Sequence, residues 1–329
     1  MAVEVLPLEE KHLADAAALV CARYRALREQ LPVMPSRYED PDAILPRLLD
    51  LAGRAPGVVA IRRGKLCGFL VAYQFPDFRG MPSTYSPEWA NGAALDDSRR
   101  IYEALYTGLS AQWVGAGYCT HLLSIMASDA GGIEGWRWLG FGLLAADGVR
   151  GLQPLAEPAR DVELRRAGLG DLQQVTTLMG ELRQYLTEPP TFLYREDAIG
   201  VEEDREWLED PAHGIWLAYQ GRDAVACMVQ GPASPRASTL IDDRGSSSIV
   251  GAYTRETERN TGIATALLNR VLAWGRAEGY ERCAVDWEPM NVLGTRFWTR
   301  YFQPLSYALI RHVDERLAGT EEPRAIAGV

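Results

Sequence analysis

The sequence repeats itself at low identity about 160 residues apart, and this repeat restricts the fold more than any single motif does. Val162–Leu164 follows the pattern of Val3–Val5, and Trp298 follows Trp136 with matching order and spacing. A period of this length indicates two similar domains and not a solenoid of short repeats. Because stretches typical of strands and helices alternate within each half, we expect an α/β fold with mixed sheets.

A linker separates the two halves. Gly151–Arg160 contains two prolines and no hydrophobic periodicity. We therefore expect one domain over residues 1–152, a linker over residues 153–160 and a second domain over residues 161–329. Within the first domain, the pattern predicts a loop over residues 76–87, which holds several prolines.

Composition excludes several classes of function. The 329 residues include 34 basic and 44 acidic side chains, for a formal charge of -10, so a basic stripe for nucleic acid is not expected. No apolar run reaches the roughly 18 residues that span a bilayer, so we expect no membrane partner. The N-terminal residues lack a basic segment followed by an apolar one, which predicts no signal peptide and a cytoplasmic protein.

The cysteines and histidines predict neither a disulfide framework nor a metal site. The five cysteines are far apart, form no C-x-x-C pair and are interpreted as small buried apolar residues. The four histidines are equally scattered, so no metal is expected.

The stretch Ser246–Leu268 predicts a strand, a short loop and a helix. Ile249, Val250 and Tyr253 favour a strand, and apolar residues from Ile263 onward recur at helical spacing. Small and polar residues at the junction leave the amides of the first helical turn exposed. Those amides and the positive end of the helix dipole favour an anion there.

The repeat shows which half is suited to that anion. It aligns Arg259 with Asp97, Gly262 with Arg100, and Ala264 with Tyr102. An aspartate repels phosphate, and the larger side chains block close approach of a ligand to the backbone. We therefore expect the second half to bind an anionic cofactor and the first half not to.

The spacing Arg259-x-x-Gly262-x-Ala264 resembles the motif of the GNAT superfamily of N-acetyltransferases. Arg282–Asn291 is similar to the strand that follows in that family together with the asparagine after it, and Phe297–Phe302 resembles its closing helix. The resemblance covers roughly residues 161–315, with a fainter version in the first half. It implies two tandem GNAT-like domains of the α/β (α+β) class, each a mixed, mostly antiparallel sheet flanked by helices, of which the first is degenerate.

The resemblance also implies acetyl-CoA as co-substrate, with the loop amides on its pyrophosphate and the strand edge beside its pantetheine arm. The residues expected to bind it are Ala252, Tyr253, Thr254, Arg259, Asn260, Thr261, Gly262, Ile263, Ala264, Thr265 and Asn291.

Direct transfer to an amine needs a base and a source of a proton for the thiolate. Asp286 and Glu288 project to one face of their strand, and Glu288 is the first candidate for the base. Many family members supply the proton from a tyrosine on the closing helix, but the alignment puts Trp298 at that place. Tyr301 lies one turn further on and is the candidate acid, with water as the alternative.

The function predicted is acetyl transfer to the amine of a small acceptor. The alternatives are a non-catalytic acyl-CoA-binding or sensor protein, and a structural protein in which neither domain binds CoA. The first half would cover the acceptor cleft or make a homodimer contact. We interpret the acidic segment Asp204–Asp210 as a solvated helix face.

Overall fold

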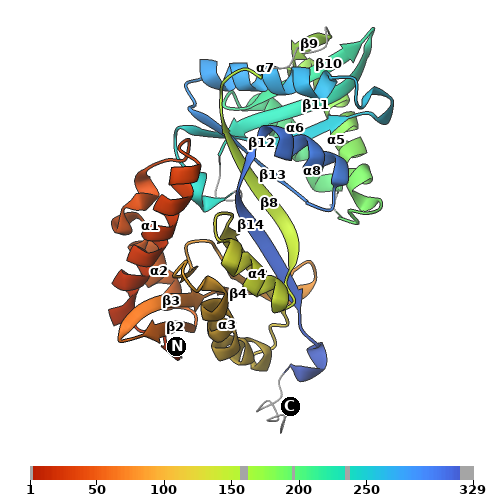
Figure 1. Ribbon diagram of the computed structural model, residues 1–329. Coiled ribbons are helices and arrows are strands. Elements are labelled where there is room, and N and C mark those ends of the chain that lie inside the picture. Colours follow the sequence, from red (N-terminus) through yellow and green to blue (C-terminus); the bar gives the residue numbers. More distant parts are fainter. Residues whose placement is uncertain (1–2, 156–161, 195–196, 234–237, 319–329) are drawn as a thin grey trace. The chain divides into compact units, whose positions relative to one another are not determined.

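The computed structural model describes residues 3–155, 162–194, 197–233 and 238–318 (Figure 1). Its contacts divide the chain into two compact units. Unit 1 combines the chain up to Ala146 with the chain from Pro304 onward, and unit 2 spans Asp147–Gln303.

These units differ from the predicted domains at the end of the chain. Strand β14 (Gln303–His312) pairs antiparallel with β7 (Thr120–Met126), with Tyr307 opposite Ile125, so the last strand belongs to unit 1. The division falls within strand β8 (Gly142–Gly151), while most of the predicted linker lies outside the described residues. The repeat and the linker composition did not reveal that the last strand belongs to unit 1, because this depends on pairing between strands that are distant in the sequence.

Unit 1 contains two four-stranded groups, β1-β2-β3-β6 and β4-β5-β7-β14, which are antiparallel except for the β5–β7 pair. Its remaining elements are β1 (Glu4–Pro7), α1 (Leu13–Gln30), α2 (Leu45–Ala52), β2 (Gly57–Arg62), β3 (Lys65–Val71), β4 (Tyr73–Phe78), β5 (Met81–Ser86), β6 (Asn91–Ala93), α3 (Ser98–Gly115) and α4 (Ala130–Trp138).

The loop predicted over residues 76–87 is wrong, because this segment forms the β4–β5 hairpin. Arg79 and Gly80 both have positive φ, 57° and 84°, as a tight hairpin turn requires. The Asp77 carboxylate accepts a hydrogen bond from the Gly80 amide at 2.7 Å. Pro76 is tolerated because β4 is an edge strand, where a missing N–H disrupts no ladder.

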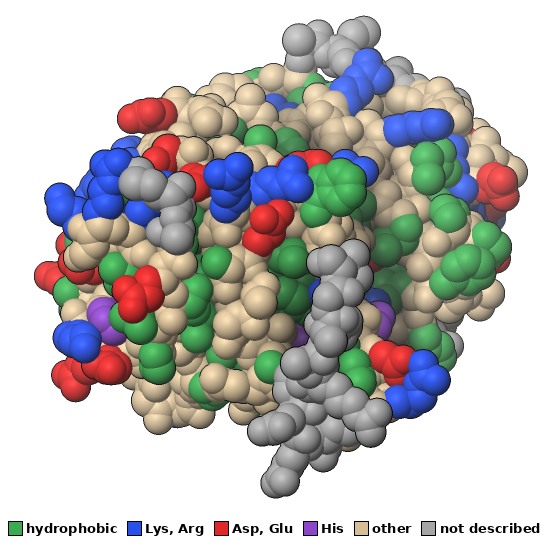
Figure 2. Space-filling view, turned by 60° about the horizontal axis from the view of Figure 1, so that its bottom comes forward, with side chains coloured by type: hydrophobic (Ala, Val, Ile, Leu, Met, Phe, Trp, Pro, Cys, Tyr) green, Lys and Arg blue, Asp and Glu red, His purple; other side chains and the backbone are tan. Residues whose placement is uncertain are grey.

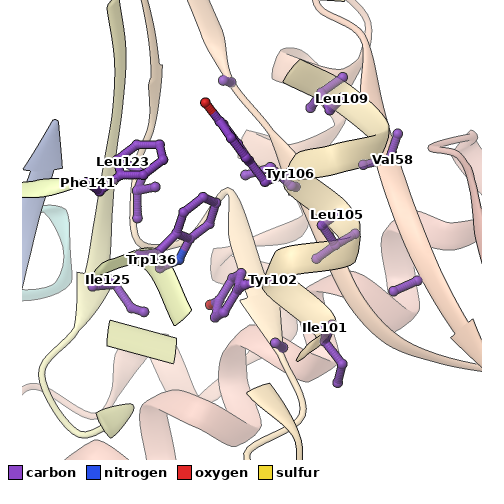
Figure 3. Packing of buried hydrophobic residues seen from close by; sticks show 14 of the residues in the cluster. Val58, Ile101, Tyr102, Leu105, Tyr106, Leu109, Leu123, Ile125, Trp136 and Phe141 are labelled. Carbon is purple, nitrogen blue, oxygen red and sulfur yellow. The ribbon is translucent and has the colours of Figure 1, made fainter. Parts of the chain in front are cut away.

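The core of unit 1 lies between its sheet and α3, whose buried face presents Ile101, Tyr102, Leu105 and Leu109 (Figure 3). A Cβ added at Gly68 of β3 would lie 2.3 Å from Ile101, so the helix and the strand are in close contact.

Unit 2 has the strand order β13-β12-β11-β10-β9, antiparallel except for the β12–β13 pair. Its elements are β9 (Glu163–Arg166), α5 (Leu172–Thr187), α6 (Asp197–Glu209), β10 (Gly214–Gln220), β11 (Asp223–Pro232), β12 (Ser246–Thr254), α7 (Ile263–Ala277), β13 (Arg282–Trp287) and α8 (Val292–Tyr301). The fold class predicted for both halves is confirmed.

Alternation along β10 places the helices of unit 2 on opposite faces of its sheet. Ile215 and Leu217 pack in one cluster with Val175 of α5. A Cβ at Gly214, which points the other way, would lie 2.9 Å from the ring of Trp274 on α7. Helix α7 therefore covers one face of the sheet, and α5 covers the other.

The repeat has a counterpart in the ends of the helices. Asp129 caps α4 by accepting a hydrogen bond from the Gly132 amide, and Asn291 caps α8 by accepting one from the Gly294 amide. Each unit thus begins its last helix with the same capping geometry.

Acidic and basic side chains are interspersed over the face shown in Figure 2. Among the described residues, no helix combines the length and apolar character that a membrane crossing requires.

Candidate active site

Strand β12 separates from its parallel neighbour halfway along. Its pairing with β13 covers Ser246–Ile249, and a bulge in the register with β11 follows at Val250. From Gly251 to Thr254 the strand continues to pair with β11. A bulge bends a strand and re-aims its side chains, so the two parallel strands open toward their carboxyl ends.

The loop after β12 ends in backbone conformations that favour glycine. Asn260 has φ 62°, and Gly262, the residue before α7, has φ 89°. The Thr261 hydroxyl donates to the Glu258 carbonyl at 2.6 Å, which closes the loop on itself. No side chain caps α7, so the amides of its first turn remain available to a ligand.

Arg259 is held beside this helix end by two aromatic rings and a carbonyl. Its Nε donates to the Thr254 carbonyl at 3.2 Å, and its guanidinium lies 4.6 Å from the Tyr185 ring centroid and 5.9 Å from that of Tyr253. Stacking on aromatic faces orients the guanidinium and leaves its charge beside the loop.

A cavity of about 590 Å³, here called the loop cavity, lies over the start of α7. Of the eleven residues predicted to bind the cofactor, Thr261 is absent from its lining, because its hydroxyl turns back to Glu258. The other ten line it: Ala252, Tyr253, Thr254, Arg259, Asn260, Gly262, Ile263, Ala264, Thr265 and Asn291.

A second cavity of about 810 Å³, here called the strand cavity, opens where β12 and β13 separate. Asp286 and Glu288 both line it, together with Val285 and Trp287, so the lining does not follow the alternation predicted for this strand. Glu203 and Trp207 of α6 line it as well.

The two cavities share four lining residues, namely Leu182, Ala252, Asn291 and Trp298. A ligand in one cavity therefore meets a ligand in the other at this junction. The Trp298 indole is largely buried there and packs edge-on against Phe297, with ring centroids 4.9 Å apart.

Residues 179–302 match the model of the acetyltransferase (GNAT) family. This segment is a GNAT domain. The search of curated proteins found no match to the chain.

Two solved structures are similar in fold. A GCN5-related N-acetyltransferase from Sphaerobacter thermophilus has a TM-score of 0.58 at 13% identity, covering 94% of this chain and 95% of its own. A GCN5-related glucosamine N-acetyltransferase region of a fungal multi-domain β-N-acetylglucosaminidase has a TM-score of 0.51 at 13% identity, covering 94% of this chain and 38% of its own. The first shares its fold with nearly the whole chain, and not with the GNAT domain alone.

The structure separates the candidate catalytic residues of the GNAT domain. Asp286 and Glu288 line the strand cavity, whereas Tyr301 lines the loop cavity. The Tyr301 hydroxyl lies 3.1 Å from Thr265 Oγ1 in the first turn of α7. Trp298, and not Tyr301, lies at the junction.

Among the lining residues of the loop cavity that sequence reasoning missed are two arginines and a tyrosine. Arg296 and Arg300 lie one turn apart on α8 and add two guanidinium groups to that of Arg259. Tyr185 of α5 donates its hydroxyl to Asn291 Oδ1 at 3.3 Å. The i, i+4 spacing of the two arginines was a usable signal, while nothing in the sequence connected Tyr185 to Asn291.

The solvated face predicted for Asp204–Asp210 is wrong at its first residue. Asp204 is completely buried, with Oδ2 3.9 Å from Arg183 Nη2. Burial raises the pKa of the Asp204 carboxyl to about 6, against the opposing effect of Arg183. The helical pattern could not show that this position faces α5.

Metal and thiol chemistry have no arranged site in the described part of the GNAT domain. No three His, Cys, Asp or Glu side chains among the described residues are grouped to hold a metal ion. Cys227 and Cys283 are buried, and burial raises the pKa of each thiol to about 12, so thiolate is disfavoured.

Proposed function

We propose that the GNAT domain transfers the acetyl group of acetyl-CoA to the amine of a small acceptor. The observation that supports this is the junction of the two cavities at Ala252, Asn291 and Trp298. One cavity has the features of a phosphate site, and the other has carboxylates suited to an amine. A thioester and an amine held in the two cavities would meet at the junction.

The residues around the loop cavity fit a phosphorylated cofactor. The left-handed Gly262 leaves no Cβ beside the uncapped amides of α7, and Arg259 adds a fixed positive charge. Arg296 and Arg300 add charge for further phosphate groups. The edge of β12 at Ala252–Thr254 would pair with the amides of the pantetheine arm.

Acetyl-CoA supplies an acetyl group activated as a thioester. The acceptor nitrogen would lose a proton and bond to the carbonyl carbon, while the carbon–sulfur bond breaks and the thiolate gains a proton. Glu288, just after β13, or Asp286 near the end of that strand, would take the first proton. Tyr301 or water would supply the second, and the amides at the end of β12 would polarise the carbonyl.

A second candidate function is non-catalytic binding of acyl-CoA. Trp298 favours it, because an indole N–H at the junction is not an acid. In either case we expect the protein to act in the cytoplasm, with no nucleic-acid or membrane partner. The first half would form a homodimer contact.

Thermal unfolding with and without acetyl-CoA tests both functions. Ligand at about 100 times its Kd should add about 2.7 kcal/mol to the free energy of unfolding. Gly262→Asp should abolish the shift, because it adds strain and negative charge at the loop. No shift in the parent protein would exclude both functions. Release of free CoA thiol with a panel of amines then distinguishes an enzyme from a binding protein.

A further inference from the structure

The strand cavity of the GNAT domain has more acidic than basic groups in its lining. Asp286 comes from β13, Glu288 from the segment just after that strand, and Glu203 from α6. The other charged or titratable side chains in the lining are Arg183 and His213. The acceptor therefore meets carboxylates from two separate elements.

Arg183 is held between α5 and α6. Its side chain is 11% exposed, and Asp204, which is completely buried, lies 3.9 Å from its Nη2. A Cβ added at Gly200 would lie 2.3 Å from Arg183 Nη1, so the guanidinium packs directly against the backbone of α6. Because Asp204 offsets its charge within the protein, Arg183 contributes little positive potential to an acceptor.

The lining also contains a buried hydroxyl without a hydrogen-bond partner among the described residues. Ser248 is 4% exposed, its Oγ is unpaired, and it lines the strand cavity. The neighbouring Ser247 points to the opposite face, where its hydroxyl donates to the Arg282 carbonyl and accepts from Gln230. Buried hydroxyls are nearly always hydrogen-bonded, so the unpaired Ser248 points to a ligand that supplies a partner.

Helix α6 presents one face to this cavity. Gly200, Glu203 and Trp207 follow one another at helical spacing and all line it. Trp207 stacks on His213, with ring centroids 6.3 Å apart, and His213 Nδ1 lies 2.8 Å from Asp210 Oδ2. Glu203 and Trp207 are one helical turn apart on α6, and a carboxylate next to an aromatic ring favours an ammonium group.

We propose that the acceptor carries at least two protonated amines. One amine reacts where the strand cavity, which Asp286 and Glu288 line, meets the loop cavity, and the other is bound by Glu203 and Trp207 of α6. This inference rests on the proposed acetyl transfer and specifies its substrate class.

The test compares linear diamines with monoamines of equal chain length, in the parent protein and in Glu203→Gln. We expect a diamine to have a KM about tenfold below that of its matched monoamine, equivalent to about 1.4 kcal/mol. Glu203→Gln should remove this advantage, so that the diamine and its matched monoamine have similar KM values. Glu206→Gln is the control, because Glu206 is an exposed residue on α6 outside the lining.

Equal KM values for the two amines, or a diamine preference that survives Glu203→Gln, would overturn the inference. The proposed function would still stand if either amine is acetylated. If acetyl-CoA raises the melting temperature but no amine reacts, calorimetric titration of the diamine and monoamine into the CoA-saturated protein decides. Tighter binding of the diamine, lost in Glu203→Gln, supports the inference, and equal binding refutes it.

Discussion

The two units begin their central helices in opposite ways. In unit 2, α7 follows a left-handed Gly262, and Ala264 in its first turn lines the loop cavity. In unit 1, α3 follows Asp97, and Tyr102 takes the place of Ala264 with its ring completely buried 5.2 Å from that of Trp136 (Figure 3). At this position of the repeat, unit 1 therefore has a buried aromatic ring where unit 2 has a small side chain that lines a cavity.

A second difference concerns the contact between the first helix and the cap of the last helix. In unit 1, Arg23 of α1 forms a buried ion pair with Asp129 at 2.7 Å. In unit 2, Tyr185 of α5 makes a neutral hydrogen bond to Asn291 at 3.3 Å, and both residues line the loop cavity. The contact between the first helix and the cap of the last helix is therefore a buried ion pair in unit 1, whereas in unit 2 it forms part of the wall of the loop cavity.

Placing the bulky residue of unit 1 into unit 2 should have the largest effect. Ala264→Tyr should weaken acetyl-CoA binding about a thousandfold, equivalent to about 4 kcal/mol, because the ring fills the loop cavity. Isothermal titration calorimetry measures it. Ala273→Tyr, at an exposed position of the same helix, should bind like the parent protein. Unchanged affinity in Ala264→Tyr would place the cofactor elsewhere.

Breaking the ion pair of unit 1 comes next. Asp129→Ala should cost about 3 kcal/mol of unfolding free energy, because it leaves the Arg23 charge buried without its partner. Asn291→Ala, the matching change in unit 2, should cost about 1 kcal/mol through its lost cap. Urea unfolding monitored by hydrogen exchange in each unit compares the two. Equal losses of unfolding free energy would mean that the two contacts stabilise their units to the same extent.

Acidification should change the stability of the two units in opposite directions. Burial lowers the pKa of His121 in unit 1 to about 4, so the unfolded state binds more protons as the pH falls below about 6.5. Unit 1 should lose about 2 kcal/mol between pH 7 and pH 5. The raised pKa of Asp204 works the other way, because protonation removes the penalty of burying its charge, so unit 2 gains stability over this range.

Hydrogen exchange resolved for each unit at the two pH values measures this contrast. His121→Gln should flatten the pH dependence of unit 1 and leave that of unit 2 as it was. A pH dependence of unit 1 that persists in His121→Gln would assign it to other groups.

The smallest effect is expected from a single guanidinium at the mouth of the loop cavity. Arg296→Gln should weaken acetyl-CoA binding about tenfold, with a reduced dependence on salt, because one phosphate contact is lost. Arg205→Gln, which removes an exposed arginine of α6 outside both cavities, is the control. Equal affinities of the two variants would remove Arg296 from the site.

Most of the loop residues named from the sequence line one cavity because their geometry is local. A left-handed position and an uncapped helix start are set by residues such as Asn260 and Gly262, which are close together in the chain. Asp204 and Tyr185 were missed because their surroundings come from packing between helices. The β4–β5 hairpin was missed because Pro76 and Gly80 are typical of loops as well as of edge hairpins.

The pairing of β14 with β7 bears on the order in which the protein is completed during synthesis. Unit 2 is one continuous segment, Asp147–Gln303, so all of it has left the ribosome before the last strand of unit 1 does. Unit 1 begins first but waits for Pro304–His312 to fill its place beside β7. Translation therefore completes unit 2, which contains the loop cavity and the strand cavity, before it completes unit 1.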